Sequence, residues 1–370
     1  MLFRSILQKR DRLIDIEPDW VHLGTDENGC GNEGLYMKEK INQVKGAFIG
    51  IAYGDAFGMP AEMWSPEMIQ KKMGYINSFL PGHPDNKISA GFAKAEVTDD
   101  TINSILVAEM LSENGGRADA QIFIKKLRYW IKHSEKSITV VGPSTAKALE
   151  LIEAGVPIEK AGSTGTTNGA AMKIIPIGLL AGSSQEKEIN SDNLLCEVIE
   201  LCRPTHYTSC AISAACAIAA GAAAAVHGER DLLKIYEYMI VMAERGSKYG
   251  ESSCSPSVAC RMRLARYFAE QDTRKALKNI YDYVGTGISS AESIPAAAAL
   301  FYMSKGDPIV CAEYAANIGG DTDTIAAMAC GICGAYKGAD SFRKDDIELL
   351  ETTNEISFEE LTGKLLGNNL

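Results

Sequence analysis

Apolar residues recur at helical spacing along almost the whole chain, and this periodicity constrains the fold more than any other feature. Alanine, leucine, isoleucine and methionine fall three and four positions apart, which is typical of helices, while the alternation typical of strands is scarce. Aspartates stand at the N-cap position of several segments, and Gly338 follows the last long one. The expected helices cover residues 101–111, 120–131, 145–152, 193–202, 210–226, 231–243, 258–269, 274–284, 294–303, 308–316 and 324–336.

The most apolar segment is the run CAISAACAIAAGAAAAV at 210–226, which raises the question of a membrane span. It has 17 residues and most of them are alanine, so its transfer into lipid would be weak. Small alanine and glycine side chains let helix axes approach closely, which favours a buried helix. We therefore predict an all-α fold, a single compact helical bundle with many crossings and no membrane span.

The charge balance limits the kind of partner. The chain of 370 residues has 48 acidic and 37 basic side chains and a net charge of −11. Nucleic-acid affinity depends on clustered lysine and arginine, so this composition argues against a nucleic-acid surface. A small-molecule partner is expected instead.

The N-terminus and the cysteines carry less information. Charged residues interrupt any apolar run in the first 20 residues, which is not the pattern of a secretion signal, so we expect a cytoplasmic protein. Residues 1–40 are richer in charge than the remainder, and we predict an arm over 1–40 and one domain over 41–370. Cys330 and Cys333 form the only CxxC pair, without a second pair or nearby histidines, and buried thiols are the expected reading.

Two short segments place acids and threonines at the start of apolar helices: VTDDTINSI at 97–105 and GGDTDTIAAMACG at 319–331. A single acid at a helix start is explained by capping, but two adjacent acids repel each other unless a cation neutralises them. Asp321 and Thr324 are three residues apart and share a helix face. Oxygen ligands of this kind suit Mg²⁺ or Mn²⁺, and the two segments together could hold two ions if the fold brings them together.

Three further segments are ambiguous by themselves. The stretch GAFIGIAYGDAFGMPAEMW at 46–64 places a lone carboxylate, Glu62, after a glycine-rich helix end, although a helix C-cap and a turn also explain it. A dinucleotide fingerprint does not fit, because no strand is expected nearby.

The loop GSTGTTNGAAMK at 162–173 could wrap a diphosphate with backbone N–H groups or could simply connect two helices. His206 precedes the alanine-rich helix, where a packed or capping histidine is equally consistent.

Taken in order, GDAFG with Glu62, then TDDT, NGAAM, Thr205-His206 and GGDTDT resemble the ADP-ribosylglycohydrolase family, over residues from about 45 to about 338. The combination of TDDT and GGDTDT is specific, whereas each other motif is weak alone. The resemblance implies an orthogonal bundle of helices that holds two Mg²⁺ or Mn²⁺ ions in a central cleft.

The resemblance also implies a role for individual residues. The implied metal ligands are Thr98, Asp99, Asp100, Asp321, Asp323 and Thr324, and the implied catalytic acids are Glu62, Asp99 and Asp100. The implied substrate-binding residues are Ser163, Thr164, Gly165, Thr166, Thr167, Asn168 and Gly169 of the loop, together with His206. Lys173 departs from the family pattern, which usually has arginine there, and we expect it to supply a mobile ammonium to the diphosphate.

The implied activity is metal-dependent hydrolysis of the N- or O-glycosidic bond of an ADP-ribosylated protein or an ADP-ribose-containing small molecule. Water would attack the anomeric carbon of the ribose, and Asp99, Asp100 or Glu62 would accept its proton. Two alternatives stay open: a hydrolase of nucleosides or other small N-ribosides, and a non-catalytic metal-binding or structural relative.

Overall fold

The structure is a computed structural model that describes residues 33–134 and 141–367 of the chain. Within these ranges the chain is helical, and three isolated bridges take the place of any strand. The helices and helical turns are α2 (Glu33–Gly58), η1 (Met59–Ala61), α3 (Pro66–Lys72), α4 (Asp99–Glu113), α5 (Ala120–His133), α7 (Pro143–Glu153), α8 (Ile158–Ala161), η2 (Asn168–Ala170), α9 (Ile175–Gly182), α10 (Ser191–Cys202), α11 (Ser209–His227), α12 (Leu232–Gly246), α13 (Val258–Ala269), α14 (Thr273–Asn279), η3 (Ile280–Val284), α15 (Ser290–Met303), α16 (Pro308–Ile318), α17 (Thr322–Lys337), η4 (Ala339–Ser341), α18 (Lys344–Asn354) and α19 (Phe358–Leu366).

The all-α prediction is confirmed, and each expected helix has a counterpart. The expected single helix over 274–284 is instead α14 followed by a π-helical turn, η3. The short helices α3, α8 and α9 were not expected, because each has too few residues for a periodic pattern to stand out. The predicted arm falls mainly on residues 1–32, outside the described residues, and one compact unit covers Tyr36–Leu370.

The alanine-rich helix α11 forms the middle of the core. It is long and apolar enough to cross a membrane by composition, but the residues from Cys210 to Val226 are buried within the protein. It packs against α9, α10, α12, α15 and α17. The prediction of a closely packed buried helix is therefore confirmed. Cys330 and Cys333 on α17 are likewise buried free thiols.

Helices α2 and α17 touch almost backbone to backbone, and glycines make this contact possible. Gly46, Gly50, Gly54 and Gly58 recur every four residues along one face of α2. A Cβ atom at Gly50 would lie 2.1 Å from the Cys330 carbonyl oxygen, and one at Gly58 would lie 2.3 Å from that of Thr322. This contact holds the C-terminal end of α2 against the N-terminal end of α17.

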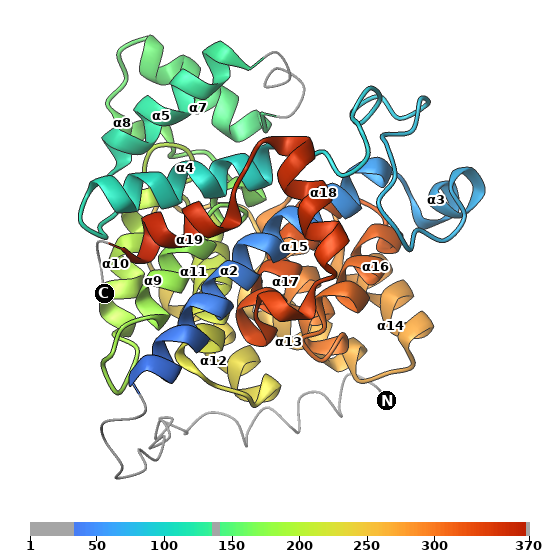
Figure 1. Cartoon of the computed structure of the whole chain (residues 1–370). Coiled ribbons are helices and arrows are strands. Elements are labelled where there is room, and N and C mark those ends of the chain that lie inside the picture. Colours follow the sequence, from blue (N-terminus) through green and yellow to red (C-terminus); the bar gives the residue numbers. More distant parts are fainter. Residues whose placement is uncertain (1–32, 135–140, 368–370) are drawn as a thin grey trace, which may run out of the picture. The chain divides into compact units, whose positions relative to one another are not determined.

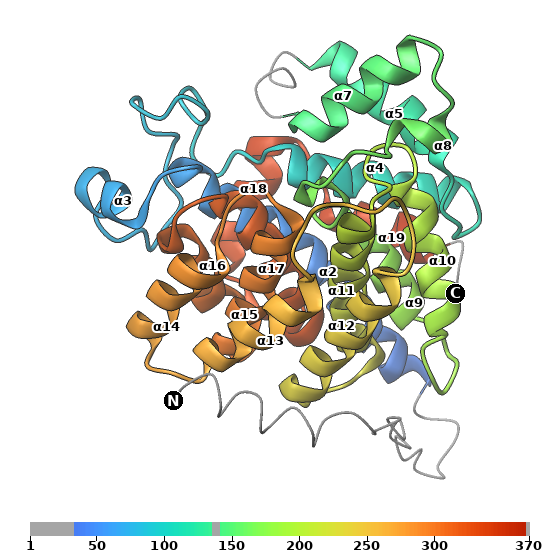
Figure 2. The same cartoon turned by 180° about the vertical axis from the view of Figure 1, so that it is seen from behind.

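The remaining helices are arranged around this pair. Helices α5, α7 and α8 gather beyond α4, and α3 lies on the side away from α10 (Figures 1 and 2). Helix α19 packs against α4 and α9, and α16 packs along α17. The N-terminal ends of α4 and α17 and the C-terminal end of α2 are thereby left close to one another.

Candidate active site

Three helix ends meet at one cluster of carboxylates. Helix α2 contributes Asp55 from its last turn, α4 begins at Asp99 and Asp100, and α17 begins after its N-cap residue Asp321. The exposed backbone N–H groups of a helix start attract negative charge, so α4 and α17 both favour acids here. All of these carboxylates are buried.

Asp55 is held by four donors from the start of α4. The backbone N–H of Thr98 donates to it at 3.0 Å and that of Thr101 at 3.0 Å. The hydroxyls of Thr98 and Thr101 donate at 2.8 and 2.5 Å. Burial still raises the pKa of Asp55 to about 6, although these hydrogen bonds lower it.

The acids form two groupings that could each hold a cation. Asp55, Asp100 and Asp323 each bring one oxygen within 4.8 Å of the others, and Glu62, Asp321 and Asp323 do the same. Asp323 belongs to both groupings. A carboxylate shared by two neighbouring ion positions is a suitable bridge between two cations, because each of its oxygens can bind one ion.

The residues of the cluster fit a hard divalent cation. Asp100 Oδ1 and Asp323 Oδ1 are buried and have no hydrogen-bond partner among the described residues. Burial and the neighbouring carboxylates raise the pKa of Asp99, Asp100 and Asp323 well above the usual range of an aspartate. Buried oxygens without a donor are costly, and an oxygen-preferring cation would satisfy them.

Glu62 is the partly exposed acid of its grouping. It follows the turn η1, and Asn86 Nδ2 donates to its backbone oxygen at 2.9 Å. Burial, followed by the negative charge of Asp321, raises the pKa of the Glu62 carboxyl to about 8. The metal-free cluster therefore favours protonated carboxyl groups at neutral pH, with Glu62 among them.

The other predicted ligands, two threonines and Asp99, lie beside the two acid groupings. The hydroxyl of Thr324 donates to Asp100 Oδ2 at 3.2 Å, and that of Thr98, which donates to Asp55, lies 3.3 Å from the same Asp100 oxygen, so both lie beside the cluster. Asp99 is buried next to it but belongs to neither grouping. Asp55 is not among the ligands predicted from the sequence. A charged residue inside the apolar stretch of α2 was the signal that could have revealed it.

The loop at 163–169 reaches the cluster through one side chain. Asn168 Nδ2 donates to Asp321 Oδ2, and the Asn168 backbone N–H donates to the Ile288 carbonyl at 2.9 Å. Neighbouring groups hold the loop carbonyls. Thr208 Oγ1 donates to Gly165 O, Ser290 N and Oγ donate to Thr166 O and Thr167 O, and Lys173 Nζ donates to Gly169 O.

Several N–H groups of the same loop remain free. No acceptor for the backbone amides of Thr164, Thr166 and Thr167 occurs in the described part of the chain, and none of these three residues is buried. The loop carbonyls accept hydrogen bonds from the protein, whereas these amides have no acceptor among the described residues. The loop therefore presents hydrogen-bond donors, which suit an anion. These amides are therefore suited to bind a diphosphate.

The chain is similar to one protein family over most of its described length. The family model of the ADP-ribosylglycohydrolases matches residues 37–369. The chain belongs to the ADP-ribosylglycohydrolase family. Its members are glycosidic-bond hydrolases, and this chain is one by membership.

Individual relatives and a solved structure are similar to this chain to different extents. The protein YegU of Escherichia coli (strain K12) is 33% identical over 322 residues, which covers 86% of this chain and 95% of YegU. The ADP-ribosylarginine hydrolase Tri1 of Serratia proteamaculans (strain 568) is 32% identical over 116 residues, 30% of this chain and 29% of Tri1. A solved structure, an ADP-ribosylglycohydrolase-related protein complex, has the same fold with a TM-score of 0.65, 22% identity, and coverage of 90% of this chain and 100% of that one.

His206, the residue that the family resemblance assigns to the substrate, lies behind the loop. Its ring is fully buried, with Nε2 3.0 Å from Thr167 Oγ1 and Nδ1 2.8 Å from Thr205 Oγ1. A Cβ atom on Gly169 would lie 2.8 Å from the ring, so glycine is needed for this packing. Burial, with a smaller contribution from Lys173, lowers the pKa of His206 well below its usual value, which keeps the ring neutral.

The expectation of a mobile ammonium at Lys173 is wrong. This side chain is 2% exposed, its Nζ donates to the Gly169 carbonyl, and Nζ lies 5.3 Å from the centre of the Phe123 ring. Burial lowers the pKa of Lys173 to about 8. The ammonium therefore supports the loop from inside the protein and does not face the substrate.

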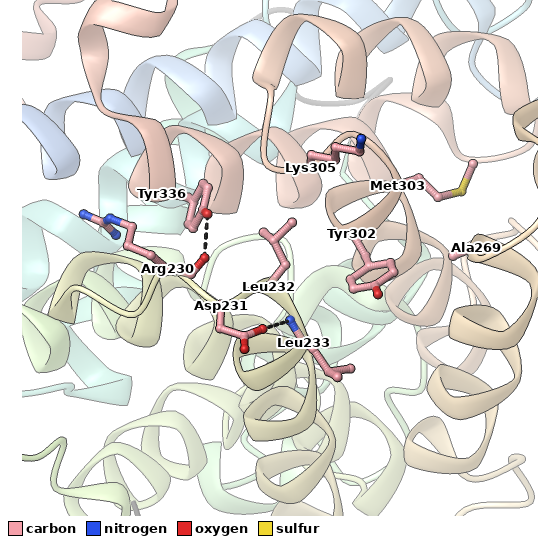
Figure 3. A pocket seen from close by; sticks show the side chains of 9 residues that line it. All are labelled: Arg230, Asp231, Leu232, Leu233, Ala269, Tyr302, Met303, Lys305 and Tyr336. Atoms are coloured by element: carbon pink, nitrogen blue, oxygen red, sulfur yellow. Dashed lines mark hydrogen bonds between the residues drawn. The ribbon is translucent and has the colours of Figure 1, made fainter. Parts of the chain in front are cut away.

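A surface pocket of about 470 Å³ lies away from this site (Figure 3). Tyr336, which lines it, is near the C-terminal end of α17, about 18 Å along the helix from Thr324. Two of its charged residues are already engaged: Arg230 is paired with Glu39 at 3.0 Å, and Asp231 caps α12. None of the clustered acids lines this pocket, so it is not the active site.

Proposed function

We propose that the protein hydrolyses the glycosidic bond between ADP-ribose and a nitrogen or oxygen of a protein or small molecule, with two Mg²⁺ or Mn²⁺ ions. The observation that carries the proposal is that Asp323 belongs to both acid groupings, while its Oδ1 and Asp100 Oδ1 are buried without a hydrogen-bond partner in the part of the chain that the structure describes. Membership of the ADP-ribosylglycohydrolase family supports the substrate class.

Different carboxylates would hold the two cations. Asp55, Asp100 and Asp323 would hold one cation, and Glu62, Asp321 and Asp323 the other. Bound cations would supply positive charge and Lewis acidity next to the anomeric carbon. Thr324, which donates to Asp100, would fix the direction of that carboxylate, and Thr98 would do the same for Asp55.

The loop and Glu62 complete the site. The free amides of Thr164, Thr166 and Thr167 would bind the diphosphate, and Asn168 would set its distance from the carboxylates. Glu62 is the partly exposed carboxylate and would accept the proton of the attacking water. His206 would keep Thr167 in position and would thereby affect substrate binding.

Hydrolysis of ADP-ribosylarginine is the first test, because the relative Tri1 is an ADP-ribosylarginine hydrolase. The protein is depleted of metal with a chelator and assayed with and without Mn²⁺ or Mg²⁺, and calorimetry counts the ions that bind. We expect activity only with metal, two ions per chain, and a higher specificity constant for ADP-ribosylarginine than for adenosine. Full activity after chelation would refute the metal site, and preferential cleavage of adenosine would refute the diphosphate role of the loop.

A further inference from the structure

Met63, which follows Glu62, has a backbone conformation that its side chain disfavours. Its φ angle is 60°, in the left-handed region where glycine is the usual residue. The side chain is 48% exposed, so its own burial contributes little to offset the strain. Backbone strain in a residue other than glycine tends to persist where the residue has a function.

The surrounding hydrogen bonds fix Met63 at the edge of the acid cluster. The Met63 N–H donates to the Gly320 carbonyl at 2.7 Å, and the Gly320 N–H donates to the Trp64 carbonyl at 2.8 Å. Gly320 directly precedes Asp321, whose carboxylate is grouped with that of Glu62. The backbone of Met63, whose apolar side chain is half-exposed, is thus tied to the residues that carry Glu62 and Asp321, two of the candidate cation ligands.

Met63 and the diphosphate loop approach the cluster from different segments. The loop contacts Asp321 through Asn168, whereas Met63 is joined to the cluster through Glu62 and Gly320. Because the diphosphate would occupy the loop, we assign the leaving group to the side of Glu62, the partly exposed carboxylate of its grouping. Met63 follows Glu62 directly in the chain.

We propose that Met63 is a specificity-determining residue that packs against the aliphatic stem of an ADP-ribosylated arginine. A thioether side chain is flexible and polarizable and adapts to chains of methylene groups. This inference rests on the proposed function, since it assigns the leaving group of the same reaction.

The test compares two substrates that share the ADP-ribose and the guanidine nitrogen but differ in the stem: ADP-ribosylarginine and ADP-ribosylguanidine. Met63→Gly is expected to lower the specificity constant for ADP-ribosylarginine about tenfold, with little change for ADP-ribosylguanidine. Its midpoint of thermal unfolding is expected to stay the same or rise, because glycine relieves the strain. Met63→Ala removes the thioether but keeps the strain, so it should show the same selective loss without a gain in stability.

Lys305→Gly is the matched control, since Lys305 also has a positive φ, of 55°, and lines the pocket remote from the acids. It should gain stability in the same way and keep the wild-type ratio between the two substrates. An equal loss on both substrates in Met63→Gly, or a clear drop in its unfolding midpoint, would refute the inference while leaving the hydrolase intact. Failure of the wild-type protein to cleave either substrate would refute the inference alone if an O-linked ADP-ribose conjugate were cleaved, and the proposed function with it if no ADP-ribose conjugate were cleaved.

Discussion

The starts of α4 and α17 carry nearly the same residues but use them differently. At the start of α4, four donors from Thr98 and Thr101 satisfy the Asp55 carboxylate. Asp100 Oδ1 at the start of α4 and Asp323 Oδ1 at the start of α17 both lack a partner among the described residues, but only Asp323 belongs to both acid groupings. The start of α4 therefore stabilises the carboxylate of α2 with its own donors, whereas the start of α17 supplies the carboxylate that the two candidate cation groupings share. Similar acid-rich motifs can thus divide structural and binding roles within one site.

Replacing Asp323 should have the largest effect on activity. Asp323→Asn removes the carboxylate common to both groupings, so we expect a loss of activity of at least about a hundredfold and weaker binding of Mn²⁺. The metal-free variant should be as stable as the wild type or more stable, because a buried like charge is removed.

The matched control is Asp231→Asn, which changes the N-cap of α12 to another good capping residue away from the cluster. It should leave activity and metal binding unchanged. A strong loss of metal-free stability in Asp323→Asn would contradict the idea that this carboxylate serves cation binding and not the metal-free fold.

Replacing Asp55 should show the opposite pattern in stability. Asp55→Asn leaves donors facing an amide nitrogen, so the free energy of unfolding of the metal-free protein should fall by about 2 kcal/mol, and activity by about tenfold or more. Chemical denaturation with and without metal measures both states. Thr101→Val, which removes a single hydroxyl donor, should cause a smaller loss of stability. Equal stability of Asp55→Asn and wild type would remove the distinction between the two helix starts.

The pKa of Glu62 makes the stability of the metal-free protein depend on pH. Its ordinary value is 4.5, and in the folded protein burial and Asp321 raise it to about 8. The folded state then binds more protons than the unfolded state between these values, so stability is full below about pH 4.5 and declines as the pH rises toward 8. Thermal unfolding of the metal-free protein across this range should show the decline, and Glu62→Gln should reduce it. A stability that rises with pH in the wild type would contradict this assignment.

Much of the fold follows from local pattern, and much of the site does not. Helices such as α11 and α17 are predictable because their apolar residues repeat at helical spacing over several turns. The acids at the starts of α4 and α17 can be recognised in the sequence, because each helix start has more acids than a cap requires. Their meeting depends on the contact of α2 with α17, which a single sequence does not reveal.

Asp55 and Lys173 show where the prediction from sequence failed. Both are charged residues in segments that become fully buried, and their partners, such as Thr101 for Asp55 and Phe123 for Lys173, are distant in the chain or on another helix. Sequence spacing predicts which residues share a helix face, but it does not predict which way a loop such as 163–169 turns its carbonyls. The direction of those carbonyls decides that Lys173 faces inward.

The smallest expected effect concerns Lys173, which acts on the α17 side through the loop and Asn168. Lys173→Met removes the ammonium that holds the Gly169 carbonyl, so the loop should bind the diphosphate less well and KM should rise about threefold with little change in kcat. Because Lys173 is 2% exposed, its charge should not contact the diphosphate, and KM should depend on salt concentration equally in the variant and the wild type. Lys173→Arg, which restores the charge, is the companion variant. If KM of Lys173→Met lost the salt dependence of the wild type, Lys173 would be a direct diphosphate ligand, and the loop would not bind the anion through its backbone amides alone.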